Sequence, residues 1–316
     1  MKKGLGMIAI LIALVSCAPA VPEIAHGVII AGTVEISSGT LNAVYWDAGT
    51  INILDSGNSS VICSFRDGSD VYILGRNSQD QYGYWKNGAF TLISASGFSL
   101  RDIAVADGKV YITGKNASTS AGYWENGIYH ALFFSTNSSD YFMNAYGIAV
   151  SGTNIAVVGS TNFLAGKGYW LNSVYHEVPG ITSWYEPYFE GTNLRIICTT
   201  NGNEIGYLEA DVYHRIIATN FYVYGVEKIG ADLYICGYIN TGGFTAPVYL
   251  KNGSLFSLSG TYTNGYTKKT ILYNNEIYFA GSVIQDSLSS AAYWKSDGTV
   301  TVLDTRESYA ESSSPE

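Results

Sequence analysis

Residues 121–130 read Ala-Gly-Tyr-Trp-Glu-Asn-Gly-Ile-Tyr-His and contain the unit that the rest of the chain repeats. A β-forming segment ends at Tyr123-Trp124, Asn126-Gly127 follows, and a second β-forming segment begins at Ile128. Asn-Gly between two such segments predicts a type I′ turn, because both central residues of that turn need φ > 0. The stretch therefore predicts a β-hairpin.

The hairpin recurs in phase along the whole chain. Seven copies of its aromatic pair stand 38 to 46 residues apart, at Tyr45-Trp46, Tyr84-Trp85, Tyr123-Trp124, Tyr169-Trp170, Tyr207-Leu208, Tyr249-Leu250 and Tyr293-Trp294. Before each copy lies a β-branched run that usually ends in glycine: Val28–Gly32, Val71–Gly75, Val110–Gly114, Ile155–Gly159, Leu194–Cys198, Leu233–Gly237 and Ile277–Gly281. In the third copy the four expected strands are 102–106, 110–113, 121–124 and 128–133.

Units of about 40 residues with four short strands are typical of β-propeller blades. We therefore predict an all-β fold, a seven-bladed β-propeller of four-stranded blades over residues 28–303; an open β-solenoid or two stacked sandwiches is the alternative. The first blade has only residues 21–26 before its β-branched run, so its first strand is expected to be short or missing. The Ser- and Glu-rich tail, residues 304–316, is predicted to be disordered, which leaves no evident strand to close the ring.

The first 17 residues have the features of an export signal. Lys2 and Lys3 precede an apolar stretch, Leu5–Val15, that is too short to span a bilayer comfortably. Leu14-Val15-Ser16-Cys17 resembles the lipobox of bacterial lipoproteins, which implies cleavage of residues 1–16 and lipidation of Cys17. Residues 17–27 would then link the lipid anchor to the propeller. An ordinary signal peptide with an incidental Cys17 is the alternative. Ala18 in place of an acidic residue is compatible, by the same resemblance, with the outer membrane.

Charge and cysteine content exclude some classes of function. From Cys17 onward the chain has 15 basic and 26 acidic residues, a net charge of −11, and no basic stripe that phosphates of a nucleic acid would need. We therefore expect no nucleic-acid partner. Cys63, Cys198 and Cys236 are expected to be buried thiols. Cys198 and Cys236 lie in matching strands of successive repeats, but their positions in those strands differ by one residue. Their side chains should therefore face opposite sides of the strands, which disfavours a disulfide between them.

The two faces of the predicted disc differ. Turns between the first and second and between the third and fourth strands are short, so that face should be smooth. The other face should carry long loops rich in aromatic residues, over 135–146, 179–188, 218–224 and 259–266. Trp184 alone among the six tryptophans lies outside the repeated pair. Aromatic side chains on loops suit a sugar ring or a peptide side chain; packing at blade ends is the alternative. The predicted ligand-binding residues are Trp184, Tyr185, Tyr188, Tyr141, Tyr146, Tyr222, Tyr224 and Tyr262.

Catalytic, metal and cofactor sites are not predicted. His130, His176 and His214 share one register in three successive copies, yet outer strands of neighbouring blades should lie farther apart than metal ligands can. Glu186 is one of several acidic residues expected on the loop-rich face, and no carboxylate pair stands out. The sequence also lacks a Gly-x-Ser-x-Gly nucleophile elbow.

The pattern Ala/Gly-Tyr-Trp-x-Asn-Gly, preceded by Val-Tyr-x-x-Gly, resembles a repeat of uncharacterised exported bacterial β-propeller lipoproteins. The resemblance covers residues 28–303 and implies the fold and a location at the cell envelope, and it carries no activity. We expect a lipid-anchored module that binds a carbohydrate or a protein through its aromatic face without catalysis. The alternatives are a polysaccharide-acting hydrolase or lyase at the same face, and a scaffold in envelope assembly.

Overall fold

The computed structural model describes residues 28–37, 39–94, 98–116, 120–133, 142–161, 167–172, 174–200, 204–218, 220–258 and 264–311. Regular secondary structure within these ranges is entirely β-strand. In this described part of the chain, no helix has the length and apolarity to cross a membrane. The predicted signal peptide and Cys17 lie outside the described residues.

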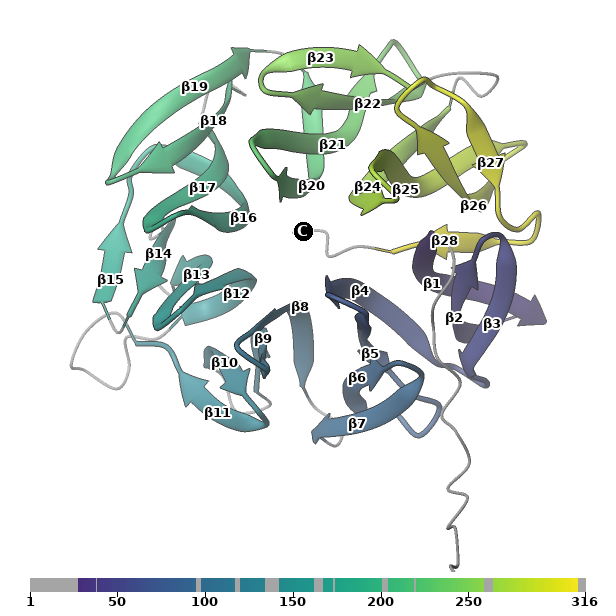
Figure 1. The fold of residues 1–316 in the computed structure, drawn as a ribbon, viewed down its shortest axis with the longest axis horizontal. Helices are drawn as coiled ribbons and strands as arrows, with labels where there is room; N and C mark the ends of the chain where they lie inside the picture. The colour runs from purple at the N-terminus through teal and green to yellow at the C-terminus, as the bar shows by residue number, and fades with distance from the viewer. Residues whose placement is uncertain are drawn as a thin grey trace, which may run out of the picture.

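Seven four-stranded antiparallel sheets stand around a common axis like the blades of a propeller (Figure 1). This arrangement confirms the predicted seven-bladed β-propeller. We number the blades 1 to 7 in the order of their Tyr-Trp elements. Each sheet runs from an inner strand near the axis to an outer strand at the rim.

The blades follow the chain in order, from the inner to the outer strand of each sheet. Blade 1 has β28 (Ser308–Ala310), β1 (Ile29–Ser37), β2 (Thr40–Asp47) and β3 (Thr50–Asp55). Blade 2 has β4 (Ser60–Asp67), β5 (Asp70–Arg76), β6 (Tyr82–Lys86) and β7 (Ala89–Ser94). Blade 3 has β8 (Ser99–Ala106), β9 (Lys109–Lys115), β10 (Ala121–Glu125) and β11 (Ile128–Ala131). Blade 4 has β12 (Phe142–Ser151), β13 (Asn154–Thr161), β14 (Lys167–Leu171) and β15 (Val174–Glu177).

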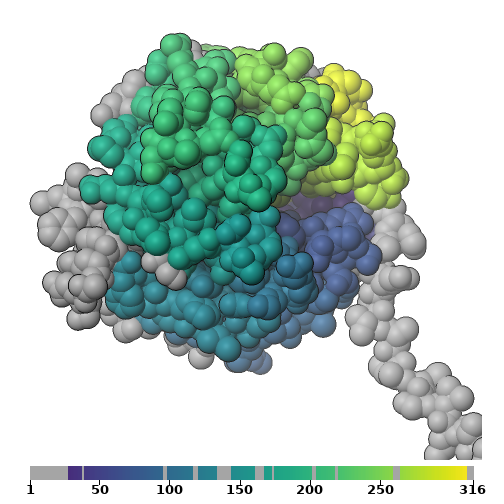
Figure 2. All heavy atoms as spheres, turned by 60° about the vertical axis from the view of Figure 1, so that its left-hand side comes forward, coloured from purple at the N-terminus to yellow at the C-terminus, as the bar shows by residue number. Residues whose placement is uncertain are grey.

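The remaining three blades complete the ring. Blade 5 has β16 (Ile181–Glu190), β17 (Asn193–Thr200), β18 (Glu204–Glu209) and β19 (Val212–Ala218). Blade 6 has β20 (Phe221–Ile229), β21 (Asp232–Asn240), β22 (Thr245–Lys251) and β23 (Ser254–Ser257). Blade 7 has β24 (Gly265–Tyr273), β25 (Glu276–Gln285), β26 (Leu288–Lys295) and β27 (Val300–Val302). Figure 2 shows the assembled ring as spheres, with the teal and green blades turned toward the viewer.

The ring is closed by the C-terminal strand β28, which is the inner strand of blade 1. It pairs antiparallel with β1 from Gly32 opposite Ala310 to Val34 opposite Ser308. The prediction of a disordered tail over residues 304–316 is therefore wrong for this strand. Its three residues are too few to show a period-2 pattern, and only pairing with the free edge of β1 makes them a strand. Closure thus joins the last described segment of the chain to the first blade.

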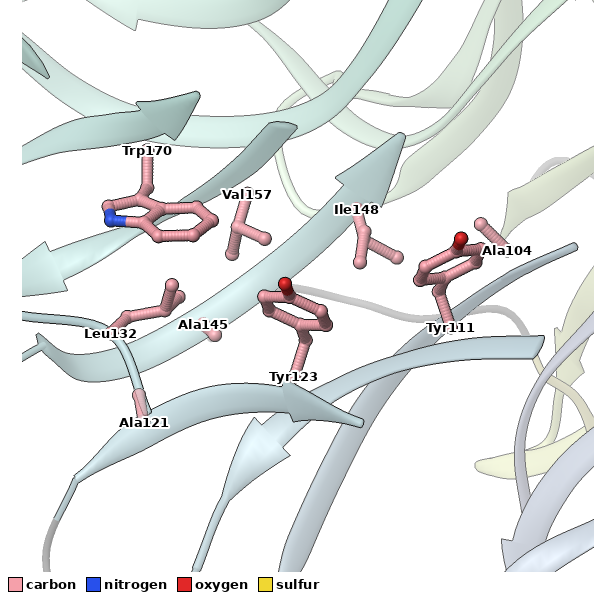
Figure 3. Close-up of a cluster of buried hydrophobic side chains, with 9 residues drawn as sticks. All are labelled: Ala104, Tyr111, Ala121, Tyr123, Leu132, Ala145, Ile148, Val157 and Trp170. Carbon is pink, nitrogen blue, oxygen red and sulfur yellow. The ribbon is translucent and has the colours of Figure 1, made fainter. Parts of the chain in front are cut away.

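The hydrophobic core is divided among the interfaces between blades. Seven clusters of buried side chains lie in the described part of the chain, one at each interface. Figure 3 shows the cluster between blades 3 and 4, where Trp170 of blade 4 packs toward Tyr123 of blade 3. The tryptophan of a Tyr-Trp pair therefore packs against the preceding blade, and this explains why each blade repeats it.

The hairpin turns have the predicted geometry. Asn126 and Gly127 both have positive φ, 48° and 85°, as a type I′ turn requires. Asn126 also pairs with the start of β9, because its side-chain oxygen accepts the amide hydrogen of Val110 at 2.9 Å and its own backbone amide donates to the Val110 carbonyl. The same two bonds link Asn87 with Val71. Asparagine is repeated at this turn because it serves the turn and the neighbouring strand together.

Six of the inner strands contain a bulge near their first third, and the bulge decides where side chains point. In β8 the partner of Leu100 is Gly114 and the partner of Asp102 is Thr113, so Arg101 is the extra residue. The corresponding extra residues elsewhere are Ile62, Tyr146, Tyr224 and Lys268, with Tyr185-Glu186 holding the extra residue of β16. A bulge breaks the alternation by which a strand is recognised. This is why the sequence predicts a first strand over 102–106 only, whereas β8 begins at Ser99.

Close approach of the inner strand requires the repeated glycine of the second strand, both in blade 2, where the inner strand has a bulge, and in blade 1, where β28 has none. A Cβ on Gly75 would lie 2.2 Å from the carbonyl oxygen of Ser60 on the inner strand, and one on Gly32 would lie 2.1 Å from that of Tyr309. Both distances are far below van der Waals contact. The repeated glycine therefore marks where the inner strand approaches the second strand most closely.

Candidate functional site

A hollow of about 410 Å³ lies between the inner strands of blades 4, 5 and 6. It is near the beginnings of these strands, which follow the predicted aromatic loops. We call it the tyrosine hollow. Its described lining residues are Tyr146, Lys167, Thr182, Ser183, Trp184, Tyr185, Tyr222, Val223, Tyr224 and Tyr238. Its volume falls within the range that small-molecule sites usually have.

The inner-strand bulges supply three of these tyrosines. Tyr146 and Tyr224 are the extra residues of β12 and β20, and Tyr185 lies in the irregular step of β16. Successive blades carry the same position to successive points around the axis. A sequence with tyrosine at this position in three consecutive blades therefore builds one aromatic wall.

The wall continues on blade 6 as a stack of rings. Tyr222 lies parallel to Tyr238, with ring centroids 4.7 Å apart and planes 8° apart, and Tyr224 contacts Tyr238 at 5.6 Å. Tyr222 is 50% exposed although it belongs to this stack. Stacking holds its ring in place while leaving a broad surface open to solvent, which is what an aromatic platform for a ligand needs.

Lys167 is the charged residue among the described lining of the tyrosine hollow. Its Nζ donates to the carbonyl oxygen of Thr182. Among the described residues no carboxylate lies within ion-pair distance of this ammonium. A lysine ammonium has three N–H donors, so two remain for another acceptor.

The structure brings together five of the eight predicted ligand-binding residues: Tyr146, Trp184, Tyr185, Tyr222 and Tyr224. Tyr188 lies elsewhere, on the wall of a second hollow along the axis. Tyr141 and Tyr262 lie outside the described residues. Tyr238 was not predicted, because it lies near the end of a second strand rather than in a variable segment. Tyr238 is directly opposite Tyr222 in the β20–β21 pair, so a correct strand register would have indicated it.

Trp184 is not a loop residue, and that expectation is wrong. It lies in β16, is only 2% exposed, and packs with Ile196, Cys198 and Leu208. Blade 5 has Leu208 where most blades have the repeated tryptophan, and Cys198 where they have glycine. In blades 1 and 2 the ring of that tryptophan lies over the glycine, 2.8 and 2.7 Å from where a Cβ would be. The smaller Leu208 leaves room for Cys198 and for an indole from the inner strand.

The described parts of the predicted aromatic loops belong largely to inner strands. β16 begins at Ile181, β20 at Phe221 and β24 at Gly265, so most of the aromatic residues belong to the first halves of inner strands. Strand backbone fixes these side chains more rigidly than a loop would. The aromatic face is therefore a feature of the propeller scaffold itself.

A second hollow, lined with charged groups, opens along the axis toward the short turns. A cavity of about 330 Å³ is lined by Asp102, Glu186, Glu227 and Lys269, with Tyr188 on its wall, and an adjoining cavity of about 500 Å³ reaches Gly68 and Gly230 in the turns. Both cavities share Phe65, Glu227, Lys228 and Lys269. The expectation that this face is smooth is therefore wrong. The turns are short, but the inner-strand side chains next to them do not fill the space around the axis, and a cavity remains there.

We call Asp102, Glu186, Glu227 and Lys269 the axial cluster. Two of its carboxylates join neighbouring blades. Asp102 Oδ2 accepts the amide hydrogen of Ile148 on the next inner strand at 2.9 Å, and Glu186 Oε2 accepts that of Val226 at 3.1 Å. The residue before each donor is a glycine, Gly147 or Gly225, and a Cβ there would lie 3.1 Å from the Tyr185 carbonyl oxygen or 2.2 Å from that of Lys268, so neighbouring inner strands approach closely at both points. Asp102 directly follows a bulge and Glu186 lies within one, so a bulge again sets the direction of the functional group.

Three groups of the axial cluster have pKa values above their usual ranges. Burial raises the pKa of Asp102 to about 6, and burial together with the charges of Asp102 and Glu227 raises the pKa of Glu186 to about 8. Although burial opposes the charge of Lys269, the nearby carboxylates raise the pKa of that ammonium above its usual range. Its Nζ lies 3.2 Å from Glu227 Oε2. Burial thus favours the protonated forms of Asp102 and Glu186, while the charge of Lys269 opposes this.

The histidines and cysteines have structural surroundings. His130, His176 and His214 each stack on the tyrosine opposite them, with centroids 4.5–4.8 Å apart, one in each of three blades. Cys63, Cys198 and Cys236 are free and buried, which confirms the prediction for these three residues. Burial raises the pKa of the Cys198 and Cys236 thiols to about 12, so neither is a reactive thiolate.

Comparison with known proteins identifies no family. No protein-family model and no curated protein matches the chain. Solved structures with a similar fold include the WD40 β-propeller domain of Doa1, at 10% identity and a TM-score of 0.49 over 88% of this chain and 94% of that one. The SapL1 lectin in complex with α-methyl fucoside has 12% identity and a TM-score of 0.44 over 78% and 95%. TolB from Acinetobacter baumannii has 9% identity and a TM-score of 0.47 over 71% of this chain, which spans 61% of TolB. Each of these is a likeness of fold only.

Proposed function

We propose that the protein is a binding module of the bacterial cell envelope that takes a carbohydrate in the tyrosine hollow. A lipid on Cys17 would hold the propeller at a membrane, with the outer membrane as the expected one. The observation that carries the proposal is the convergence of Tyr146, Tyr185, Tyr222 and Tyr224 from three blades on one hollow of about 410 Å³.

The shape and chemistry of the hollow favour a sugar over a protein surface. A volume of this size encloses one or two sugar rings, whereas a stable protein interface covers about 800 Å² per partner. Tyrosine rings contribute contact area against the apolar face of a sugar, and their hydroxyl groups bond to its hydroxyl groups. Few rotatable bonds in tyrosine keep the entropic cost of binding low.

Binding of the full-length protein to an immobilised panel of oligosaccharides tests this function. The double variant Tyr222→Ala and Tyr224→Ala should lower the affinity for a bound sugar at least about tenfold, since aromatic contacts of this kind contribute on the order of 1 kcal/mol each beyond their area. Phe244→Ala is the matched control, because Phe244 is 56% exposed on the same blade and is not among the lining residues. Equal affinity of the double variant and the wild-type protein would reject the site, and capture of a protein with no sugar bound would reject the ligand class.

A hydrolase or lyase acting on polysaccharide is the second candidate, and the axial cluster favours it. A carboxyl with a pKa of about 8 beside one with a pKa of about 6 is an arrangement that acid–base catalysis uses. Turnover of a polysaccharide by the wild-type protein that Glu186→Gln abolishes, with folding retained, would establish this function. Both acids accept bonds from the next blade, so unfolding of the two proteins must be compared in the same experiment.

A further inference from the structure

We infer that the sugar bound in the tyrosine hollow carries an anionic substituent, a carboxylate or a sulfate, and that Lys167 recognises it. This inference rests on the proposed carbohydrate-binding function and names the class of sugar that the hollow selects.

The first argument is the charge of the lining. Its described residues comprise tyrosines, small polar residues, a valine, a tryptophan and one lysine. Elsewhere on the blades basic side chains are usually paired, as Lys251 is with Asp232 at 2.8 Å and Lys295 with Glu276 at 3.1 Å. Lys167 has a carbonyl oxygen as its partner and no carboxylate within ion-pair distance in the described structure. A ligand anion would supply the missing counter-ion.

The second argument is the position of the ammonium. Lys167 begins β14 in blade 4, and its bond to the Thr182 carbonyl ties it to the first residues of β16 in blade 5. This bond holds the ammonium beside Ser183 and Tyr185, on the same rim as the tyrosine wall. A sugar ring stacked on the tyrosines would therefore have a substituent within reach of the two remaining donors of Nζ.

The third argument concerns the charges farther along the rim. Tyr224 contacts Tyr266 at 5.6 Å, and the next basic group, Lys268, is paired with Glu311 at 2.7 Å. That pair adds no net charge to the hollow. The chain from Cys17 onward is acidic overall, yet charges more than about 10 Å away are largely screened at physiological salt. Lys167 therefore supplies the one charge among the described lining residues that a ligand in the hollow meets.

The test measures the affinity of the full-length protein for matched trisaccharides of one backbone. These are a uronate trisaccharide, its carboxyl-reduced neutral counterpart, and the sulfated form of that counterpart. The wild-type protein should bind one or both anionic forms about tenfold more tightly than the neutral form, as expected for one hydrogen-bonded charge, and the two anionic arms distinguish carboxylate from sulfate. This preference should weaken as salt is raised.

Variants of Lys167 separate this inference from the proposed function. Lys167→Gln should remove the preference for the anionic forms over the neutral form, and Lys167→Arg should keep that preference. Lys109→Gln is the control, since Lys109 lies on blade 3 and pairs with Glu125 at 2.7 Å. Equal or better binding of the neutral sugar by the wild-type protein would overturn the inference and leave the carbohydrate function standing. Absence of binding to all sugars on the oligosaccharide panel would overturn both.

Discussion

Removal of the last strand tests whether ring closure is what holds this propeller together. A chain that ends at Arg306 lacks β28, and with it the hydrogen bonds from Glu35 to the Glu307 carbonyl at 2.9 Å and from Ala291 to Ser308 Oγ at 2.8 Å. It also lacks the bond from Glu311 to the Ala31 carbonyl at 3.1 Å. These three bonds lie outside the β1–β28 ladder and contribute about 3 kcal/mol at about 1 kcal/mol each, and loss of the ladder adds to this.

Loss of β28 also uncovers apolar surface. Ala310 is fully buried and belongs to the cluster between blades 7 and 1, with Val34 and Ile30. Exposing about 80 Å² of this surface adds about 2 kcal/mol. The total of at least about 5 kcal/mol is a large part of the 5–15 kcal/mol by which domains are usually stable. The melting temperature should fall by roughly 10 °C or more.

Unfolding in denaturant, followed by tryptophan fluorescence and circular dichroism, measures this loss. A synthetic peptide of residues 307–316 added to the truncated chain should restore part of the stability, because a strand that fills a free sheet edge can bind in trans. Truncation that changes the free energy of unfolding by less than about 1 kcal/mol would refute the reasoning. Destabilisation without rescue at high peptide concentration would show that the loss has a cause other than the missing strand.

Four further predictions concern single substitutions in the blades. Gly32→Ala should lower the free energy of unfolding by about 3 kcal/mol, because its Cβ would lie 2.1 Å from a carbonyl of β28. Gly253→Ala, at a φ of 83° with its nearest atom at 3.5 Å, should cost only about 1 kcal/mol in the same denaturation experiment. Trp184→Ala should cost about 3–5 kcal/mol as a core truncation does, and a loss below about 0.5 kcal/mol would mean that the indole is a surface group after all. The pKa of Glu186 is raised on folding, so the folded chain keeps a proton that the unfolded chain has lost; stability should fall as pH rises from about 4.5 to about 8, and Glu186→Gln should flatten that fall in unfolding curves measured across this range. An equal slope in both proteins would contradict the displaced pKa.

The sequence predicts those residues of the candidate site that are recognisable by their aromatic side chains. Tyr146, Tyr185, Tyr222 and Tyr224 stand out as aromatic residues between repeats, and the structure places all four at one hollow. Tyr188 does not share that hollow, because an inner strand continues through this segment and carries the later residue toward the opposite end of the axis. Lys167 and Tyr238 gave no signal in sequence, since each is an ordinary strand residue until neighbouring blades are placed beside it.

Local chemistry determined the repeated unit of this protein. Asn-Gly forces a tight turn, β-branched runs make strands, and seven such units in phase leave few folds that bury all of their apolar faces. Tertiary structure decided the contacts between strands that are not neighbours in the sequence. The pairing of β28 with β1, the insertion of Trp184 beside Leu208, and the reach of Asp102 and Glu186 to the next inner strand all join residues far apart in sequence. A bulge shifts the side-chain alternation by one residue, so only the register of paired strands shows which side chains face the axis, the hollow or the core.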